Sequence, residues 1–291
     1  MHNQHTQRTP ISAVVLTKNE AHHIAACLAT LNWADELLVV DSFSTDDTVA
    51  LAQQHGARVV QHPFSNFAHQ RNVAQHLARH DWVLFIDADE RVSPELRDEI
   101  LARAAAGTLD TCTAYHIQRL HLYSGRWFPD PARRRITPAL HRQIRRRDMA
   151  RLVNRRVARW ERAVHEVVSV PEPRGVLNGV IYHYSTTNLS AAYEAINHYS
   201  DLEAALLHRT LKRKRITVAE AVLRGIRTFV YHLFIWQGLR GGVAGFHFAA
   251  HVGFLKYLIY AKLGERLRIA QGHGVWTDAD RALLHRYEVQ E

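Results

Sequence analysis

The sequence predicts an α/β protein, with a doubly wound, Rossmann-like sheet flanked by helices and followed by a helical C-terminal region. Up to about residue 110, short apolar runs alternate with segments whose apolar residues recur at helical spacing. From Leu189 onward the spacing is helical throughout. Because alternating strands and helices favour parallel pairing, we expect ligands to bind beyond the carboxyl ends of the strands.

Four buried strands and the helices between them account for the first hundred residues or so. The strands are expected over Ile11–Thr17, Glu36–Asp41, Arg58–Val60 and Trp82–Ile86. The helices are marked by apolar residues at helical spacing: Ile24, Cys27, Leu28 and Leu31 in the first, Val49 and Ala52 in the second, and Phe67, Val73, Ala74 and Leu77 in the third. Ser44-Thr45-Asp46 can cap the second helix, Gly56 can end it, and Ser93-Pro94 begins a fourth.

Beyond residue 110 the pattern becomes strand-like and irregular. Strands are expected over Thr113–Leu120, Val164–Val170 and Val176–Tyr184, with an arginine-rich stretch between the first two that runs from Arg133 to Arg162. In the helical region, Gly225, Gly238, Gly241 and Gly242 are expected breaks. We predict an α/β domain over residues 10–188 and a helical region over 189–291.

Composition narrows the class of protein. Hydrophobic residues make up 47% and charged residues 22% of the 291, which excludes a disordered chain. The two cysteines, Cys27 and Cys112, are too few for a disulfide framework and stand in no zinc-binding spacing, which favours a reducing cytoplasm. The N-terminal residues lack the apolar run of a secretory signal, and the longest uncharged apolar stretches, 228–239 and 241–255, are shorter than a spanning helix requires.

Acidic side chains gather at the predicted carboxyl ends of the strands. Asp41 closes the second strand and Asp87 the fourth, while Thr17 to Glu20 follow the first. In Asp87-Ala88-Asp89, carboxylates two residues apart point the same way if the backbone is extended. Such a pair can hold a divalent cation, Mg²⁺ or Mn²⁺, against a diphosphate. The alternative is a pair of solvated turn residues or helix caps.

Three motifs follow one another along the chain: ISAVVLTKNE from Ile11, DSFSTDDT from Asp41 and WVLFIDADE from Trp82. Shorter elements are Trp33-Ala34-Asp35-Glu36, Gln70-Arg71-Asn72, Ser93-Pro94-Glu95-Leu96, Gly125-Arg126-Trp127, Val164-His165-Glu166, His183-Tyr184-Ser185 and Phe254-Leu255-Lys256-Tyr257. In this order the three motifs resemble those of the family 2 glycosyltransferases, and the shorter elements resemble the branch of lipopolysaccharide-core β-glucosyltransferases. The resemblance covers about residues 10–265.

This resemblance implies a GT-A fold, an inverting mechanism and a nucleotide-sugar donor, most often a UDP-sugar. It further implies transfer of a hexose such as glucose to a glycolipid or lipopolysaccharide-core oligosaccharide. The residues implied to bind the donor are Thr17, Asn19, Glu20 and Asp41 at the nucleoside, Arg71 at the diphosphate, and Asp87 near the ribose or the metal. Asp89 is implied to be the direct metal ligand. For Arg71, a solvated helix surface is the alternative.

An inverting transfer also needs a base that takes the proton of the acceptor hydroxyl. Glu166 is the candidate catalytic residue, and an exposed strand glutamate paired with a neighbouring arginine is the alternative. His183 is a candidate for completing the metal shell or touching the diphosphate. Because the chain has 21 histidines, a packing or surface role is its alternative.

Some positions depart from the family pattern. Phe43 stands where related sequences usually carry a glycine, so the turn after Asp41 or the pocket wall is expected to differ. The arginine-leucine-phenylalanine element usual before the base appears only as Arg142-Gln143-Ile144, which affects the acceptor side. The sequence has no QxxRW motif of the processive relatives, which disfavours a polymer synthase.

The net charge of +9 predicts an anionic partner. Two basic segments suit acceptor phosphates or an anionic membrane surface. One is the arginine-rich stretch from Arg133 to Arg162, and the other is Lys212-Arg213-Lys214-Arg215, which precedes aromatic helices. A solvated basic face and a helical hairpin packed on the main domain are the alternatives. We expect a cytoplasmic location, including the cytoplasmic face of the inner membrane.

Other functions remain as alternatives. A nucleotidyltransferase would also use paired aspartates, but no glycine-rich phosphate loop follows the first strand. A basic nucleic-acid-binding protein would show a recognisable RRM, KH or zinc-finger pattern, and the sequence has none, so no nucleic acid is expected. The acidic residues Asp87, Asp89 and Glu166 speak against a non-catalytic membrane scaffold.

Overall fold

The chain forms two compact units. The computed structural model describes residues 8–123, 125–133, 135–147, 150–162, 166–186, 189–211, 213, 215–235, 239–282 and 284. The first unit comprises Met1–Leu120 and Arg133–Ser185, and the second comprises His121–Ala132 and Thr186–Glu291.

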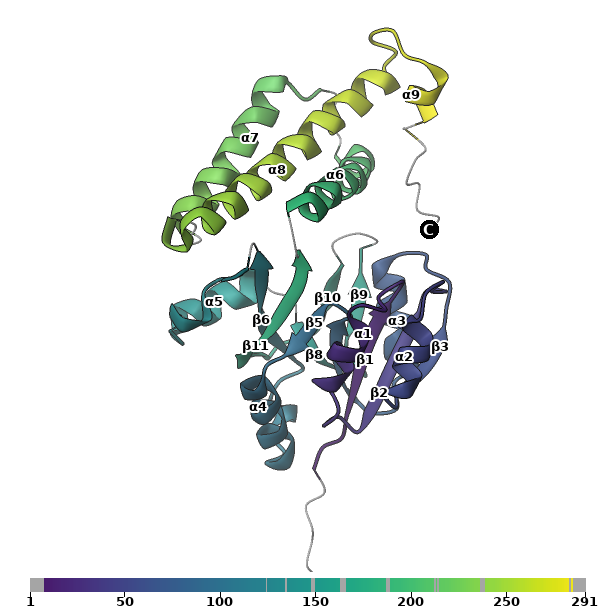
Figure 1. Cartoon of the computed structure of the whole chain (residues 1–291), viewed down its shortest axis with the longest axis vertical. Helices are drawn as coiled ribbons and strands as arrows, with labels where there is room; N and C mark the ends of the chain where they lie inside the picture. Colours follow the sequence, from purple (N-terminus) through teal and green to yellow (C-terminus); the bar gives the residue numbers. More distant parts are fainter. Residues whose placement is uncertain are drawn as a thin grey trace, which may run out of the picture. The chain divides into compact units, whose positions relative to one another are not determined.

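A mixed sheet organises the α/β part of the chain (Figure 1). In the described residues its order is β3-β2-β1-β4-β8-β6-β11-β5, and β7 pairs with β6. The strands are β1 (Ile11–Thr17), β2 (Glu36–Asp41), β3 (Arg58–Gln61), β4 (Trp82–Asp87), β5 (Glu90–Val92), β6 (Ala114–Tyr123), β7 (Arg126–Phe128), β8 (Ala150–Asn154) and β11 (Arg174–Thr186). A separate antiparallel pair consists of β9 (Arg159–Glu161) and β10 (Val167–Ser169).

The first four strands are parallel, as the sequence predicts, with β1 between β2 and β4. The register places Thr17 beside Asp41 and Leu16 beside Asp87. The carboxyl ends of three strands therefore meet at one edge of the sheet, which confirms the predicted convergence of their polar residues.

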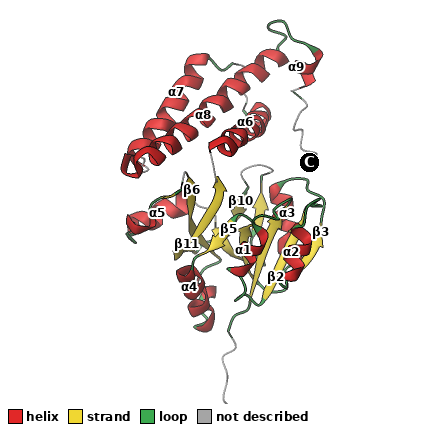
Figure 2. Ribbon diagram, in the orientation of Figure 1, coloured by secondary structure: helices red, strands yellow, loops and turns green. Residues whose placement is uncertain are grey.

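Helices cover both faces of these strands (Figure 2). The helices of the first unit are α1 (Ile24–Ala29), α2 (Thr48–Gln54), α3 (Phe67–Leu77), α4 (Pro94–Ala105) and α5 (Pro138–Arg147). On β1, Ala13 and Val15 pack in the core that contains residues of α1 and α4, whereas Val14 packs in the core that contains residues of α3. Burial on both faces explains why these strands are apolar without alternation.

The arginine-rich stretch is more regular than the sequence predicts. It contains α5 and then β8, which pairs antiparallel with both β4 and β6 and so lies inside the sheet. Of the strand expected over Val164–Val170, only Val167–Ser169 is a strand among the described residues. The expected apolar face of α3 is also partly wrong, because Phe67 is exposed while Arg71 is buried.

The second unit is helical, as predicted. Its helices are α6 (Leu189–Thr210), α7 (Val218–Val230), a π-helical turn η3 (Tyr231–Ile235), α8 (Gly242–Ala270) and α9 (Asp278–Ala282), with short 3₁₀ turns elsewhere in the chain over Leu109–Thr111, Pro131–Arg133 and Leu239–Gly241. α8 packs against both α6 and α7. No helix in the described part of the chain is long and apolar enough to cross a membrane.

Gly225 does not break a helix, contrary to the sequence prediction. It lies inside α7 at the crossing with α8, where an added Cβ would come within 2.9 Å of Tyr257 Cβ and 3.1 Å of the Gly253 carbonyl oxygen. Gly225 therefore permits close helix packing. Gly242, with a positive φ of 62°, does mark the beginning of α8, and Gly238 lies outside the described residues.

Candidate active site

Asp41 organises the edge of the sheet where the parallel strands end. Its side chain is fully buried and accepts hydrogen bonds from Thr17 Oγ1 (3.0 Å), Gln61 Nε2 (3.1 Å), and the backbone N–H (2.9 Å) and hydroxyl of Ser44. Burial alone would raise the pKa of Asp41, but the hydrogen bonds from Ser44, Gln61 and Thr17 outweigh it and hold this pKa below its usual value. Asp41 is thus an ionised anchor for the loop that follows β2.

The loops after β1 and β2 are fastened to each other. The Asn19 backbone N–H donates to Ser44 Oγ at 2.8 Å, and Asn19 Oδ1 accepts from the Thr45 backbone N–H at 2.8 Å. Asn19 and Phe43 both have positive φ, 55° and 58°. At the position where the family resemblance predicts glycine, Phe43 therefore adopts the backbone conformation that glycine favours, and its ring is exposed.

Glu20 follows in the same loop, and its backbone N–H donates to Thr48 Oγ1 at 2.8 Å. Burial, together with the nearby carboxylates of Asp89, Asp46 and Asp87, raises the pKa of Glu20 to about 7. The carboxylates at this edge thus repel one another, and a bound cation would relieve that repulsion.

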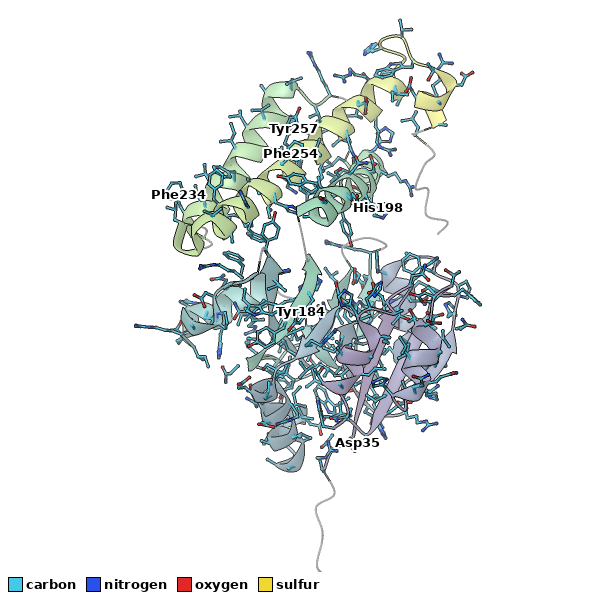
Figure 3. All side chains as sticks on the ribbon, viewed as in Figure 1. Asp35, Tyr184, His198, Phe234, Phe254 and Tyr257 are labelled. Atoms are coloured by element: carbon cyan, nitrogen blue, oxygen red, sulfur yellow. The ribbon has the colours of Figure 1, made fainter. Side chains whose placement is uncertain are left out.

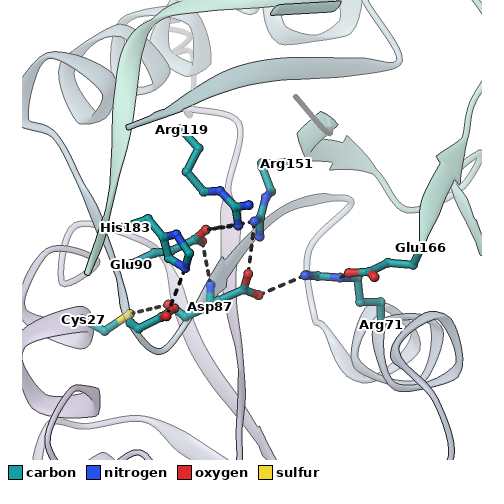
Figure 4. Close-up of polar contacts among 9 residues, drawn as sticks. Cys27, Arg71, Asp87, Glu90, Arg119, Arg151, Glu166 and His183 are labelled. Carbon is teal, nitrogen blue, oxygen red and sulfur yellow. Dashed lines mark hydrogen bonds and ion pairs between the residues drawn. The ribbon is translucent and has the colours of Figure 1, made fainter. Parts of the chain in front are cut away.

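Arg71 joins the edge of the sheet to Glu166 (Figure 4). From α3, its Nη2 donates to Asp87 Oδ1 and its Nε donates to Glu166 Oε1, each at 2.9 Å. The Arg71 side chain is only 2% exposed, and its guanidinium lies 4.9 Å from the ring centroid of Trp160. Arg71 therefore does not lie on a solvated helix surface. It is a buried cation that donates hydrogen bonds to the carboxylates of Asp87 and Glu166.

The residues around Arg71 on α3 place the segment that carries Glu166. Asn72 makes two hydrogen bonds with the backbone of Trp160 in β9, one to its carbonyl oxygen (2.9 Å) and one from its N–H (3.0 Å). Gln75 accepts a hydrogen bond from Trp160 Nε1 at 3.1 Å. Because β9 pairs with β10, and Glu166 directly precedes β10, these contacts fix where Glu166 lies. Val164 and His165, the residues before it, lie outside the described residues.

Arg151 is a site residue that the sequence did not single out. From β8, its Nη2 donates to Asp87 Oδ2 (3.1 Å) and to Glu90 Oε1 (2.9 Å), and Arg119 from β6 donates to the same Glu90 oxygen. Glu90 is fully buried and also accepts from the Asp87 backbone N–H. Burial opposes the charge of Asp87, yet Arg151 and Arg71 outweigh it and hold the pKa of Asp87 well below its usual range. The run of arginines concealed Arg151, although its apolar neighbours in β8 set it apart.

Asp89 has a different partner from Asp87. Its Oδ2 lies 3.0 Å from His183 Nε2, and its carbonyl oxygen accepts from the Tyr184 N–H at 2.8 Å. The structure therefore brings His183 to Asp89, and the metal role of the two residues stays a prediction. The expectation that Asp87 and Asp89 point the same way assumed extended backbone, but Ala88 and Asp89 form a turn.

The donor atoms suit a cation whose shell is completed by a substrate. Within the described residues, no three His, Cys, Asp or Glu side chains are arranged to hold a metal. Asp87 and Asp89 keep 31% and 22% of their side chains exposed. Mg²⁺ is commonly held by one or two carboxylates, with substrate phosphates and water supplying the other ligands. A cation at Asp89 bound together with a diphosphate fits this chemistry.

Comparisons with known proteins identify the family of this chain. The sequence model described as "Glycosyl transferase family 2" matches residues 12–155. A protein of Rickettsia felis described as an uncharacterized glycosyltransferase is 33% identical over 282 residues, which cover 91% of this chain and 95% of that protein. The chain belongs to glycosyl transferase family 2. The matched segment contains the proposed donor residues from Thr17 to Asp89, and Glu166 follows it.

This family 2 glycosyltransferase is also similar to a further curated protein and to a solved structure. The "Lipopolysaccharide core biosynthesis glycosyltransferase LpsC" of Rhizobium meliloti is 28% identical over 269 residues, covering 89% of this chain and 93% of LpsC. Among solved structures, S. aureus TarS 1–349 in complex with UDP-GlcNAc is 16% identical, with a TM-score of 0.46, and the match covers 96% of this chain and 91% of that one. The mixed sheet with flanking helices and the helical C-terminal region are those of the predicted GT-A-type fold class.

Proposed function

We propose that this glycosyltransferase moves a hexose, such as glucose, from a UDP-sugar to a glycolipid or lipopolysaccharide-core acceptor, with inversion at the anomeric carbon. The observation that carries the proposal is that Arg71 links Asp87, at the edge where the parallel strands end, to Glu166, the prospective base. Similarity to LpsC over most of both chains supports the acceptor class.

The donor nucleoside is proposed to lie between the loops after β1 and β2. Thr17, Asn19, Glu20 and Asp41 are the residues we assign to it. The hydrogen bonds of Asp41 and Asn19 support a preformed pocket wall, since they fix both loops without a ligand. Glu20 keeps part of its surface open and is the carboxylate in this group best placed to accept from a ribose hydroxyl.

A divalent cation, Mg²⁺ or Mn²⁺, is proposed to bind at Asp89, with His183 beside it and Asp87 near the ribose or the metal. When bound, such a cation neutralises the charge that develops on the departing diphosphate. Asp87 stays ionised because Arg151 and Arg71 flank it. Direct contact of Arg71 with the diphosphate stays a prediction, and its buried contacts support a positioning role for its charge.

Glu166 is proposed to act as the base. Its carboxylate takes the proton of the acceptor hydroxyl while that oxygen bonds to the anomeric carbon from the face opposite the leaving group. The bond between that carbon and the diphosphate oxygen breaks, and UDP leaves with the electron pair. The hydrogen bond from Arg71 Nε holds one carboxylate oxygen, Oε1, and so orients the carboxylate for this step.

An acceptor anchored in lipid would bring the enzyme to an anionic membrane surface, which we propose to be the cytoplasmic face of the inner membrane. The basic side chains of the chain, net charge +9, support attraction to such a surface and to acceptor phosphates.

Calorimetric titration with UDP, with and without Mn²⁺ or Mg²⁺, tests the donor site. Metal-dependent binding that weakens at least about tenfold in Asp89→Asn would support the proposal, because one metal ligand is lost. Asp98→Asn, which changes an exposed carboxylate on α4, is the matched control and should bind as the unaltered protein does. Failure of the folded protein to bind any nucleotide would overturn the proposal. If UDP binds, proton NMR of the product's anomeric signal then checks inversion.

A further inference from the structure

Helix α7 exposes most of its large apolar side chains. At its contact with α8 the small residues Ala221 and Gly225 are buried, and Arg224 and Phe229 also meet residues of α8. The residues exposed on α7 are Val218 (69%), Leu223 (65%), Val222, Ile226 and Val230. At about 100° per residue, these side chains fall within one arc of roughly 140°, which begins beside the contact with α8 and extends away from it. Large apolar side chains that are exposed together in this way are typical of an interaction surface.

The apolar surface continues beyond α7. In η3, Phe234 is 61% exposed, and at the beginning of α8 Val243 is 73% exposed and Phe246 about half exposed. The rings of Phe229 and Phe246 lie edge to face, 5.6 Å apart, which joins the α7 and α8 parts. Figure 3 shows Phe234 at the end of this helical hairpin. We call Val218, Val222, Leu223, Ile226, Val230, Phe234, Val243 and Phe246 the apolar face.

Basic groups border the apolar face. Arg227 lies at its edge on α7 and is exposed, and Arg215 precedes the helix and is exposed. The one acidic residue of α7, Glu220, is already paired with Arg213 and Arg224. In the sequence, residues 209–227 contain seven Lys or Arg and only this one acidic residue. This segment of the sequence, which leads into α7 and contains most of it, is therefore strongly positive.

We propose that the apolar face docks in the headgroup region of an anionic lipid bilayer, with α7 lying along the surface. Exposed aliphatic and aromatic side chains bordered by arginines are the features by which a helix binds an interface without crossing it, its apolar face entering about 5–10 Å. The charge favours this occupant over a second copy of the chain, since two such positively charged borders would repel each other. The proposal deepens the proposed function by naming the surface that would meet the membrane, yet its test needs no donor.

Vesicle flotation with the full chain tests the proposal. The probes are vesicles of phosphatidylcholine alone and vesicles containing roughly a third of phosphatidylglycerol. We expect binding mainly to the anionic vesicles, and at least about a tenfold weaker partition for Leu223→Glu/Ile226→Glu, because two apolar contacts are lost and two negative charges are added. Val275→Glu, at a fully exposed apolar position after α8, is the matched control and should partition nearly as the unaltered chain does.

Several results would overturn the docking proposal. Equal flotation of the double variant and the control, or absence of flotation with anionic vesicles, would do so. So would light scattering that finds a dimer which Leu223→Glu/Ile226→Glu converts to a monomer, because a second copy would then be the occupant. Circular dichroism on the same variants checks that they fold, and calorimetry with UDP checks the donor site. A variant that loses flotation but still folds and binds UDP has lost only the docking of the apolar face.

Discussion

Arg71 and Glu166 lie 95 positions apart in the sequence, yet Arg71 Nε donates to Glu166 Oε1 over 2.9 Å. The same guanidinium holds Asp87, so a single cation fixes two carboxylates for which we propose different roles. Both carboxylates are at least partly withdrawn from water, and a positive partner offsets the cost of burying such groups. The contact therefore couples the donor edge of the sheet to the prospective base.

Replacing Arg71 should destabilise the protein strongly. Arg71→Ala would leave Asp87 and Glu166 with fewer positive partners, and breaking such a buried pair lowers the free energy of unfolding by about 3–5 kcal/mol. Urea denaturation measures this change. Arg71→Lys keeps the charge without the two-pronged geometry and should lose less. Arg79→Ala removes an exposed arginine that pairs with Glu36 and should change the free energy by less than about 1 kcal/mol. A loss of that small size for Arg71→Ala would contradict the coupling.

Glu166→Gln should abolish most of the transfer while sparing the donor site. The amide oxygen can still accept from Arg71, so the segment should keep its position, but an amide cannot take a proton. We expect the rate of sugar transfer to fall by about 10²- to 10⁴-fold. The affinity for UDP should change by less than about twofold, by calorimetry. Glu172→Gln, at an exposed carboxylate, controls for the loss of one charge. If Glu166→Gln transferred the sugar at a rate within tenfold of that of the unaltered enzyme, Glu166 would not be the base.

The parallel half of the fold was predictable because its signals are local. β1, β2 and β4 are largely continuous apolar runs buried on both faces, and each helix carries its own spacing, so Thr17, Asp41 and Asp87 could be placed at one edge. The cap of α4 was predictable for the same reason: Ser93 Oγ accepts from the Leu96 N–H, with Pro94 at the first helical position. The N-cap residue expected for α2 within Ser44-Thr45-Asp46 was wrong, because Asp47 is the N-cap residue of α2 and makes no side-chain cap hydrogen bond.

In the antiparallel half, the strands over Ala114–Tyr123 and Arg174–Thr186 were largely predictable, but β8 and the contacts of its residues were not, because these depend on long-range partners. β8 carries Arg151 in an apolar strand, and only the fold shows that this arginine meets Asp87 and Glu90. The apolar residues beside Arg151 indicate a strand, but an ion pair between distant residues leaves no periodic trace, so the sequence does not show that Arg151 meets Asp87 and Glu90. The exposure of the apolar side chains on α7 was not predicted either, because the spacing of apolar residues does not show which side of a helix packs against its neighbour.

Phe43 offers a test of backbone strain at the donor edge. A non-glycine residue with φ of 58° is strained by about 1 kcal/mol or more, and the exposed ring gains little from burial. The free energy of unfolding of Phe43→Gly should therefore be about 1 kcal/mol higher than that of Phe43→Ala. Both variants lack the ring, but only glycine removes the backbone strain. Thermal or urea denaturation of the two variants makes the comparison. Equal stabilities would show that the loop relaxes without strain.

Glu20 should make both stability and metal binding depend on pH. Its pKa is raised from 4.5 to about 7 in the folded protein, so the folded state holds a proton that the unfolded state releases. The contribution of Glu20 to stability is therefore fully present below about pH 4.5 and is lost as the pH rises through 7. Glu20→Gln should flatten this part of the pH profile of the free energy of unfolding.

A cation at Asp89 favours ionised Glu20, because its charge offsets the carboxylates that raise this pKa. Metal binding with UDP should then release up to one proton near pH 6, and the affinity should be up to about tenfold weaker at pH 6 than at pH 8. Calorimetry in two buffers of different ionisation enthalpy counts the released protons. In Glu20→Gln the proton count should fall by the share due to Glu20, whereas Glu95→Gln, at an exposed carboxylate on α4, should leave the count unchanged. An unchanged count in Glu20→Gln would mean that the cation does not reach this group of carboxylates.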